Sequence, residues 1–429
     1  DGIATVSHLD LKTGNHHLIF EFSGVTEGVD ETVTAEAFNT AYTWDGGGGD
    51  ALWSTATNWS SDIVPTSADT VTFDNTCTGA NCNPILDINT TISSLTISSS
   101  TIIQNDDLTL RVTGAFSQSA GYFKGGTGTT TFGGAITVSG GTFTPATSTV
   151  INSGAVTINI NTTQEFYHLH ATSTGIKTIS SGDTLVVKGD LYLVDGSFNT
   201  GTIDSRGNIY QSSTFDGGSA VIDFGDDAVP QTYAINGGTG PILRLDSVAD
   251  ASDTIVFNAA ATLYGATTSS SFVGTIPISN PSNYDLTFGS SGWTQAAGTF
   301  QGGTGTTTIN GNFTISGGTY NAATTTIFNS SLTINVNTTQ TFYNLISDSS
   351  GTKTISSNDT IVVLGTLTMN DGSFTGTTGI IEAWGNIIQN SLVDNPGVSP
   401  PILDFSNDSV AQTYTINGGV GPIVRYNSA

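Results

Sequence analysis

The amino-acid sequence contains a long internal duplication. The motif GGTGTTT occurs at residues 125–131 and returns at 302–308. Internal repetition with small drift is typical of stacked architectures, in which each unit buries its apolar face against the next. Three longer strings return in the same order after 176 to 181 residues: NTTQEFYHL (161–169) as NTTQTFYNL (337–345), SSGDTLVVKGDLYLVDGSF (180–198) as SSNDTIVVLGTLTMNDGSF (356–374), and QTYAINGGTGPILR (231–244) as QTYTINGGVGPIVR (412–425).

A shorter repeat lies inside the long one. The segment DLTLRVTGAF at 107–116 matches DTLVVKGDL at 183–191 and DTIVVLGTL at 359–367. Apolar residues occupy every second position, while residues such as Arg111 and Lys188 fall between them, which predicts strands with one buried face. Some intervening positions are apolar, and we expect a neighbouring element to cover them: Val186, Val362 and Leu364.

The composition predicts an all-β protein. Glu and Lys are scarce, whereas Thr, Val, Ile, Phe and 52 glycines favour strands joined by tight turns. A net charge of −26 argues against binding to nucleic acid or anionic lipid. No stretch is apolar enough to cross a bilayer, so we expect no membrane insertion. The chain begins at Asp1 with neither Met nor a signal peptide, so we expect a processed form or a fragment.

We predict that the chain folds as a parallel β-helix, that is, a β-solenoid of tandem repeats. Coils of about 20 residues would give roughly twenty turns. The alternative is a series of tandem β-sandwich domains. The duplications favour the solenoid because they recur at unequal intervals, and single coils are added or lost more easily than single strands of a sandwich.

Four regions are expected along the chain. Residues 1–43 hold four of the six glutamates and the alternating string HHLIFEF, and are predicted to form a distinct N-terminal β segment, either a cap or an exchanged strand. Residues 44–106 form a Trp-rich entry region with a short Cys loop. The first long repeat covers residues 107–284, and a second, truncated long repeat covers residues 285–429.

One family resemblance supports this organisation. The string TWDGGGGDALWSTATNWSSDIVPTSADTVTFDNT at 43–76 resembles the W-D-G-G-G…W-x-x-x-x-N-W…P…D-x-V-x-F segment of large bacterial surface and autotransporter-like repeat proteins, where it often opens β-helical regions. The later strings FTISGGTYNAATTTIFNSSLTI, TFYNL and GTLTMNDGSF resemble the same proteins. The resemblance implies a β-helical protein at a cell surface.

The chain has two cysteines, Cys77 and Cys82. Their spacing allows a short disulfide-bonded loop, which suits an exported protein. Two reduced thiols are the alternative interpretation. A zinc site is disfavoured because no histidine lies nearby.

Two sets of residues are candidate metal ligands. His168 and His170 share a strand face, but no third ligand is evident, so a half-exposed strand face is favoured. We expect no cofactor other than, at most, structural calcium, because Asp-Gly is also good turn chemistry. The candidate calcium ligands come from Asp-Gly turns and the DGGGGD loop: Asp45, Asp50, Asp195 and Asp371.

Aromatic residues are interpreted as structural. Trp44, Trp53 and Trp59 could stack on sugar rings, but sealing of the first coil is favoured, because terminal coils otherwise expose apolar edges. Four other aromatic residues are interpreted as stacked core beside Asn ladders: Phe166, Tyr167, Phe342 and Tyr343.

We expect no catalytic residues and no enzyme activity. Adjacent carboxylates on a strand point to opposite faces, which argues against a joint site. No motif with a defined mechanism includes the acidic residues considered: Asp106, Asp107, Asp223, Asp226, Asp227, Asp404 and Asp408.

The predicted function is that of an extracellular structural protein, a subunit of a surface filament or adhesin shaft. The sequence stops inside its repeat, and an unpaired coil there invites strand addition from the N-terminal segment of the next subunit. The expected partners are further copies of the chain and, in addition, surface glycans. The alternative is a carbohydrate-binding or polysaccharide-degrading β-helix protein. The residues expected in the head-to-tail contact are Ile19, Phe20, Phe22, Ile423, Val424 and Tyr426.

Overall fold

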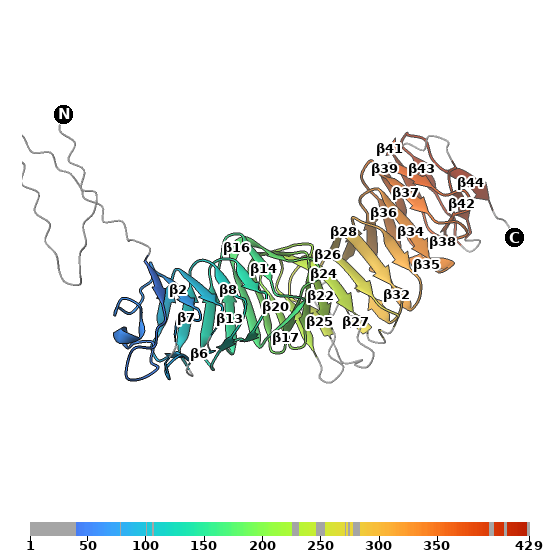
Figure 1. Ribbon diagram of the computed structural model, residues 1–429. Coiled ribbons are helices and arrows are strands. Elements are labelled where there is room, and N and C mark those ends of the chain that lie inside the picture. The colour runs from blue at the N-terminus through green and yellow to red at the C-terminus, as the bar shows by residue number, and fades with distance from the viewer. Residues whose placement is uncertain are drawn as a thin grey trace, which may run out of the picture. The chain divides into compact units, whose positions relative to one another are not determined.

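The computed structural model describes residues 40–77, 79–99, 101–104, 107–224, 231–245, 254–270, 272, 275–277, 284–393, 399–406 and 410–426. Strands make up 56% of the structure, and the described residues contain no α-helix, only a 3-10 turn at Ala56–Asn58. Every pairing between the described strands is parallel, and the coils form a β-solenoid (Figure 1). The predicted fold class is therefore confirmed.

Each coil contributes a strand to three faces. Face 1 contains, in coil order, β4 (Thr90–Ile92), β7 (Thr109–Val112), β10 (Thr129–Phe132), β13 (Ser148–Ile151), the first parts of β16 (His168–Ile179) and β18 (Leu191–Asn199), β20 (Ile209–Gln211), β23 (Thr232–Ile235), β25 (Thr254–Phe257), β27 (Thr275–Pro277), β29 (Thr299–Gln301), β32 (Thr319–Asn321), β35 (Thr339–Phe342), β38 (Thr360–Val363), β40 (Ile380–Ala383), β42 (Ile402–Phe405) and β44 (Ile423–Tyr426).

Face 2 begins at the first described strand. It contains β1 (Ala41–Thr43), β2 (Thr70–Phe73), β5 (Ser94–Ile97), β8 (Phe116–Gln118), β11 (Ile136–Val138), β14 (Val156–Asn159), the second parts of β16 and β18, β21 (Phe215–Gly217), the first parts of β24 (Thr239–Leu245), β26 (Ala261–Thr268) and β28 (Leu286–Gln295), β30 (Thr306–Ile309), β33 (Thr325–Phe328), β36 (Asn344–Ser347), the first part of β39 (Leu367–Thr375), β41 (Ile387–Val393) and β43 (Tyr414–Ile416).

Face 3 closes the coil. It contains β3 (Ile85–Leu86), β6 (Thr101–Gln104), β9 (Tyr122–Lys124), β12 (Thr142–Thr144), β15 (Thr163–Phe166), β17 (Thr184–Val187), β19 (Thr202–Ser205), β22 (Val221–Phe224), the second parts of β24, β26 and β28, β31 (Phe313–Ile315), β34 (Leu332–Val336), β37 (Thr352–Ile355) and the second part of β39.

The solenoid has about 15 turns, fewer than the roughly twenty that the sequence predicts. Two features account for the difference. Some coils are longer than 20 residues: the first described one carries Ala41 onto Thr70, its partner in the ladder. In addition, residues 1–39, most of the segment 1–43 that is predicted as a distinct N-terminal element, lie outside the described residues, whereas Ala41–Thr43 forms β1 of face 2.

The core follows the period-two pattern. Leu185 and Val187 on β17 are fully buried, as are Ile361 and Val363 on β38. The intervening Val186 is also buried, at 4% exposure. It lies in the ladder between Glu165 and Asp204, so neighbouring coils of the same chain cover it, as Val362 is covered in the second copy. Leu364, by contrast, is 45% exposed.

The two long copies are rotated relative to each other by one face. β10 carries the first GGTGTTT motif and belongs to the face 1 ladder through β7 and β13. β30 carries the second motif but pairs with β28 and β33, in the ladder of face 2. Likewise, β17 lies on face 3, whereas its counterpart β38 lies on face 1. The duplicated unit therefore does not span a whole number of coils.

Candidate functional site

The first described coil is closed by a tryptophan cluster. Trp44, Trp53 and Trp59 are each at most 1% exposed. The Trp59 ring meets those of Trp44 and Trp53 edge-on, with centroids 4.9 and 4.6 Å apart, and its Nε1 donates to the Trp53 carbonyl at 2.9 Å. Rings buried in this way support the interpretation that they seal the coil rather than stack on a sugar.

A disulfide loop supports this cluster. As predicted, Cys77 and Cys82 lie at bonding distance, with an S–S separation of 2.07 Å. The loop between them holds Asn81, whose backbone carbonyl accepts a hydrogen bond from Trp44 Nε1 at 2.8 Å. The disulfide therefore fixes the loop that satisfies a buried indole.

We expect the double substitution of Cys77 and Cys82 by serine to cost about 2 kcal/mol of unfolding free energy, because the closed loop is short. The loss should be confined to the tryptophan end, where hydrogen exchange of the Trp44 and Trp59 amides should accelerate. An equal acceleration on β37 and β38 would contradict this local role.

The four calcium candidates make local turn hydrogen bonds. Asp45 accepts from the Gly47 amide at 3.0 Å, and Asp50 accepts from the Leu52 amide at 3.1 Å, a bond that lowers the pKa of Asp50. Asp195 and Asp371 each accept from the amide of the following glycine, at 2.7 and 2.6 Å. Within the described ranges, no three His, Cys, Asp or Glu side chains group as metal ligands would. Structural calcium stays a prediction.

A buried lysine, Lys177, lies beside Asp195 and is not among the sites predicted from the sequence. Lys177 on β16 is fully buried, and its ammonium donates to the backbone carbonyls of Ser173, Gly175 and Asp195, the last two at 3.0 Å. Asp195 belongs to the next coil, so the ammonium links two coils. Burial lowers the pKa of Lys177 to about 8, against an opposing effect of the Asp195 charge.

The second copy contains the same arrangement. Lys353 on β37 is fully buried and donates to the carbonyls of Ser349 and Gly351, at 2.7 and 2.9 Å. Burial lowers its pKa to about 8, opposed first by the charge of Asp371. We call these two sites the lysine cages. Each holds an ammonium on backbone carbonyl oxygens, three for Lys177 and two for Lys353, so the chain itself supplies positive charge beside Asp195 and Asp371.

The two histidines lie on one face, as predicted, and take part in different contacts. His168 Nδ1 accepts a hydrogen bond from the Asp190 amide at 2.8 Å. His170 stacks on Tyr192 with ring centroids 4.3 Å apart, and Tyr192 stacks on Tyr210 at 5.1 Å. Burial, followed by the His168 charge, lowers the pKa of His170. The pair belongs to a ladder of ring stacks along face 1.

The repeated carboxylates on β22 and β42 are in ion pairs. Asp223 pairs with Arg244 of the next coil, and Asp404 pairs with Arg425 at 2.5 Å. Each ion pair joins a strand to the strand stacked on it in the next coil. Asp107 has a left-handed backbone, with φ of 62°. The other acidic residues considered lie outside the described residues: Asp106, Asp226, Asp227 and Asp408.

The last described coil has no described strand stacked on its outer edge, and the first copy shows what such a strand covers. Ile235 on β23 is fully buried because β25 stacks on it, with Phe257 as its ladder partner. Its counterpart Ile416 on β43 is 61% exposed. Leu243 is buried beneath β26, whereas its counterpart Val424 is only partly buried. Inward positions are thus uncovered at this end among the described residues.

The same coil carries the predicted assembly residues that the structure describes. Ile423 and Val424 lie on β44, and Ile423 is 56% exposed. Tyr426 ends that strand, and its side chain lies outside the described residues. Three other apolar residues expose more than half of their surface near this end: Leu392, Val410 and Val420. The N-terminal candidates Ile19, Phe20 and Phe22 lie outside the described residues.

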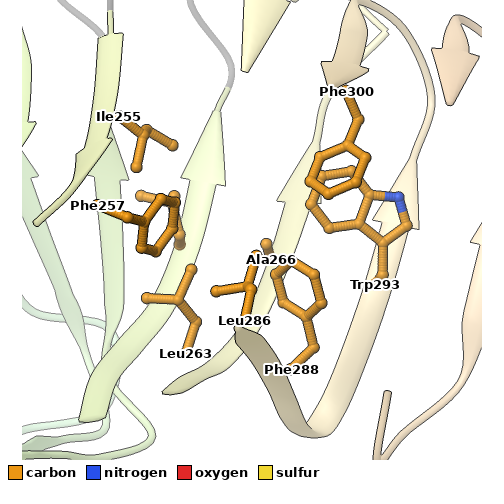
Figure 2. Close-up of a pocket in the computed structure, with 9 residues that line it drawn as sticks. Ile255, Phe257, Leu263, Ala266, Leu286, Phe288, Trp293 and Phe300 are labelled. Atoms are coloured by element: carbon orange, nitrogen blue, oxygen red, sulfur yellow. The ribbon is translucent and has the colours of Figure 1, made fainter. Parts of the chain in front are cut away.

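A small cavity lies in the solenoid interior where the first copy gives way to the second. Figure 2 shows side chains of successive coils converging on it, including Leu263, Leu286 and Trp293. Its volume is about 10 Å³ and its lining is entirely apolar. A space of this size and polarity stays dry, so it marks loose packing rather than a ligand site.

The structure confirms the prediction for two of the four aromatic residues and contradicts it for the other two. Phe166 and Phe342 are buried, as predicted, and Asn ladders are present, such as Asn236 with Asn258 at 2.8 Å. Tyr167 and Tyr343 are 51% and 56% exposed, so their assignment to the core is wrong. Each follows the last residue of a strand, where the corner turns the side chain outward.

No helix in the described ranges has the length and apolar character that crossing a bilayer requires. Comparison with protein-family models, with curated proteins and with solved structures finds no match to this chain.

Proposed function

We propose that the chain is the subunit of an extracellular filament or adhesin shaft, joined head to tail by β-strand complementation. The observation that carries this is the contrast between Ile235, fully buried, and its counterpart Ile416, 61% exposed. An uncovered coil of a parallel solenoid presents both unpaired backbone groups and apolar side chains, and a further strand satisfies both.

The sequence contains a segment suited to this coil. Residues 17–20 read HLIF, and Thr254–Phe257, the strand that covers Ile235 in the first copy, reads TIVF. In β25 the inward residues are Ile255 and Phe257, which are 3% and 4% exposed. The same register would place Leu18 opposite Tyr414 and Phe20 opposite Ile416, with Ile19 facing outward.

Ion pairing supports a stable receiving end. Arg425 of β44 bonds Asp404 of β42, as Arg244 bonds Asp223 in the first copy, and the carboxylate raises the pKa of Arg425. The last strand is thereby held to the coil before it. A preformed edge of this kind lowers the ordering cost of strand addition.

Substituting Phe20 by glutamate should abolish end-to-end assembly of the full chain, because a charge would replace the ring that covers Ile416. His17→Thr is the matched control, since the same register places His17 at the outward position that Thr254 occupies in β25. Sedimentation velocity and negative-stain electron microscopy of the three proteins provide the measurement.

The receiving end is tested separately with Ile416→Glu, which should also leave short or single particles. Only Ile416 is substituted; its counterpart in the first copy, Ile235, lies inside the stack of coils and keeps its native side chain. A wild-type chain that stays monomeric at high concentration, or filaments that Phe20→Glu leaves intact, would refute the proposal.

A further inference from the structure

A column of exposed apolar side chains runs along the second copy. Tyr343, Leu364 and Trp384 follow the last residues of β35, β38 and β40, and they are 56%, 45% and 40% exposed. The Leu364 amide bonds the Phe342 carbonyl and the Trp384 amide bonds the Val363 carbonyl, so the three residues stack on successive coils. We call them the aromatic column.

The exposed indole of Trp384 is an exception in this chain. The other four tryptophans are at most 1% exposed: Trp44, Trp53, Trp59 and Trp293. Trp384 Nε1 also donates to Glu382 at 2.7 Å, which fixes one edge of the ring. Large apolar side chains aligned on a surface mark an interaction site more often than scattered ones do.

The first copy has a different column at the equivalent corner. Tyr167, Lys188 and Arg206 take the places of Tyr343, Leu364 and Trp384, and the Tyr167 side chain is half exposed. We call these three residues the basic column. Lys188 bonds Glu165 at 2.6 Å, and Arg206 bonds Asp204 at 2.8 Å.

Cations are rare enough in this chain for their placement to matter. The sequence has nine Lys and Arg against 35 Asp and Glu, so most approaches of one copy to another bring like charges together. Lys188 and Arg206 remain about half exposed, at 46% and 44% of their side chains. The basic column is therefore a place where a second copy meets less repulsion.

We propose that the aromatic column of one copy binds the basic column of another. Both columns repeat at the strand spacing of about 4.8 Å, so three contacts form in register. In parallel alignment the Trp384 indole meets the Arg206 guanidinium, a cation–π contact, and Glu382 beside it adds negative charge. The aliphatic stem of Lys188 meets Leu364.

The contact is heterologous and does not close on itself. The aromatic column follows strands of face 1 and the basic column follows strands of face 3, so the two lie at different corners of the coil. Repeating such a contact joins copies side by side in an open array. A contact of three residues is weak alone and gains strength when many copies are aligned. It does not depend on the end-to-end contact.

The test uses the full chain carrying Ile416→Glu, so that proposed end contacts do not mask side contacts. In this background, Leu364→Ser with Trp384→Ala removes the aromatic column, and Lys188→Glu with Arg206→Glu reverses the basic column. Each pair should weaken self-association at least tenfold by sedimentation velocity. Tyr264→Ala, at a tyrosine that is 37% exposed elsewhere, is the control and should leave association unchanged.

Mixing provides the sharper result. The first variant keeps an intact basic column and the second keeps an intact aromatic column, so a mixture should form dimers that neither forms alone. Circular dichroism checks that both fold. Absence of dimers in the mixture, or unchanged association in either variant, would overturn the proposal. So would a glycan array on which Trp384→Ala abolishes binding while side-by-side association is unaffected, since the column would then be a saccharide platform.

Discussion

Replacing Trp293 by alanine should lower the free energy of unfolding by about 3–5 kcal/mol, the usual cost of deleting a buried tryptophan. The ring is 1% exposed, and its centroid lies 4.9 Å from that of Phe288 and 4.7 Å from that of Phe300. It already borders the small cavity between the two copies, so the deletion would enlarge an existing void (Figure 2). Chemical denaturation monitored by circular dichroism gives the measurement.

Trp293→Phe is the matched control. The structure describes no hydrogen-bond partner for the buried Trp293 Nε1, and a buried donor without a partner lowers stability. The phenyl ring of the variant fills less volume, which lowers stability, but it also removes this donor, which raises stability. We expect a change below about 1.5 kcal/mol. If phenylalanine destabilises as strongly as alanine, packing at the cavity is not the cause.

Substituting Lys177 by methionine should lower the free energy of unfolding by about 2–4 kcal/mol, since methionine fills the space but leaves three carbonyl oxygens without their donor. Relief of the buried charge offsets part of this cost. Lys188→Met is the control: that ammonium is half exposed in an ion pair, and its loss should cost less than 1 kcal/mol. Equal losses in both variants would contradict the cage.

The pH dependence tests which effect sets the lysine pKa. The folded pKa of about 8 lies below the ordinary value near 10.4, so between these values the unfolded chain binds more protons. Wild-type stability should therefore rise from pH 8 to about 10.4 relative to the Lys177→Met, Lys353→Met double variant. A fall over that window would mean that the carbonyls stabilise the ammonium more than burial disfavours it.

The fold could be predicted from sequence because its rules are local. The alternation of apolar and polar residues at every second position decides which side chains face inward, and Leu185 and Ile361 follow it. The number of coils could not be predicted, since it depends on how far each corner loop extends, and the pattern does not encode that length. The rotation between copies was also hidden, because equivalent strands read alike whichever face they occupy.

The sites in the structure also differ in how far the sequence could have indicated them. The lysine cages had a signal, since Lys177 and Ile179 occupy one face of β16 by alternation and Lys353 recurs with Ile355. That signal was outweighed by the expectation that lysines face solvent. The exposure of Tyr167 and Tyr343 had no signal in the sequence, because the outward turn occurs one residue beyond the strand and depends on the geometry of the corner.

The one-face rotation between the copies has a consequence for how such chains grow. Had duplication required whole coils, each new copy would repeat its surface on the same side. Here the repeated unit contains a fraction of a coil beyond a whole number, so the same sequence must fit more than one of the three faces. Three consecutive copies at this offset would present the same surface on each of the three faces in turn. A longer chain would then offer that surface to partners on all sides rather than on one side.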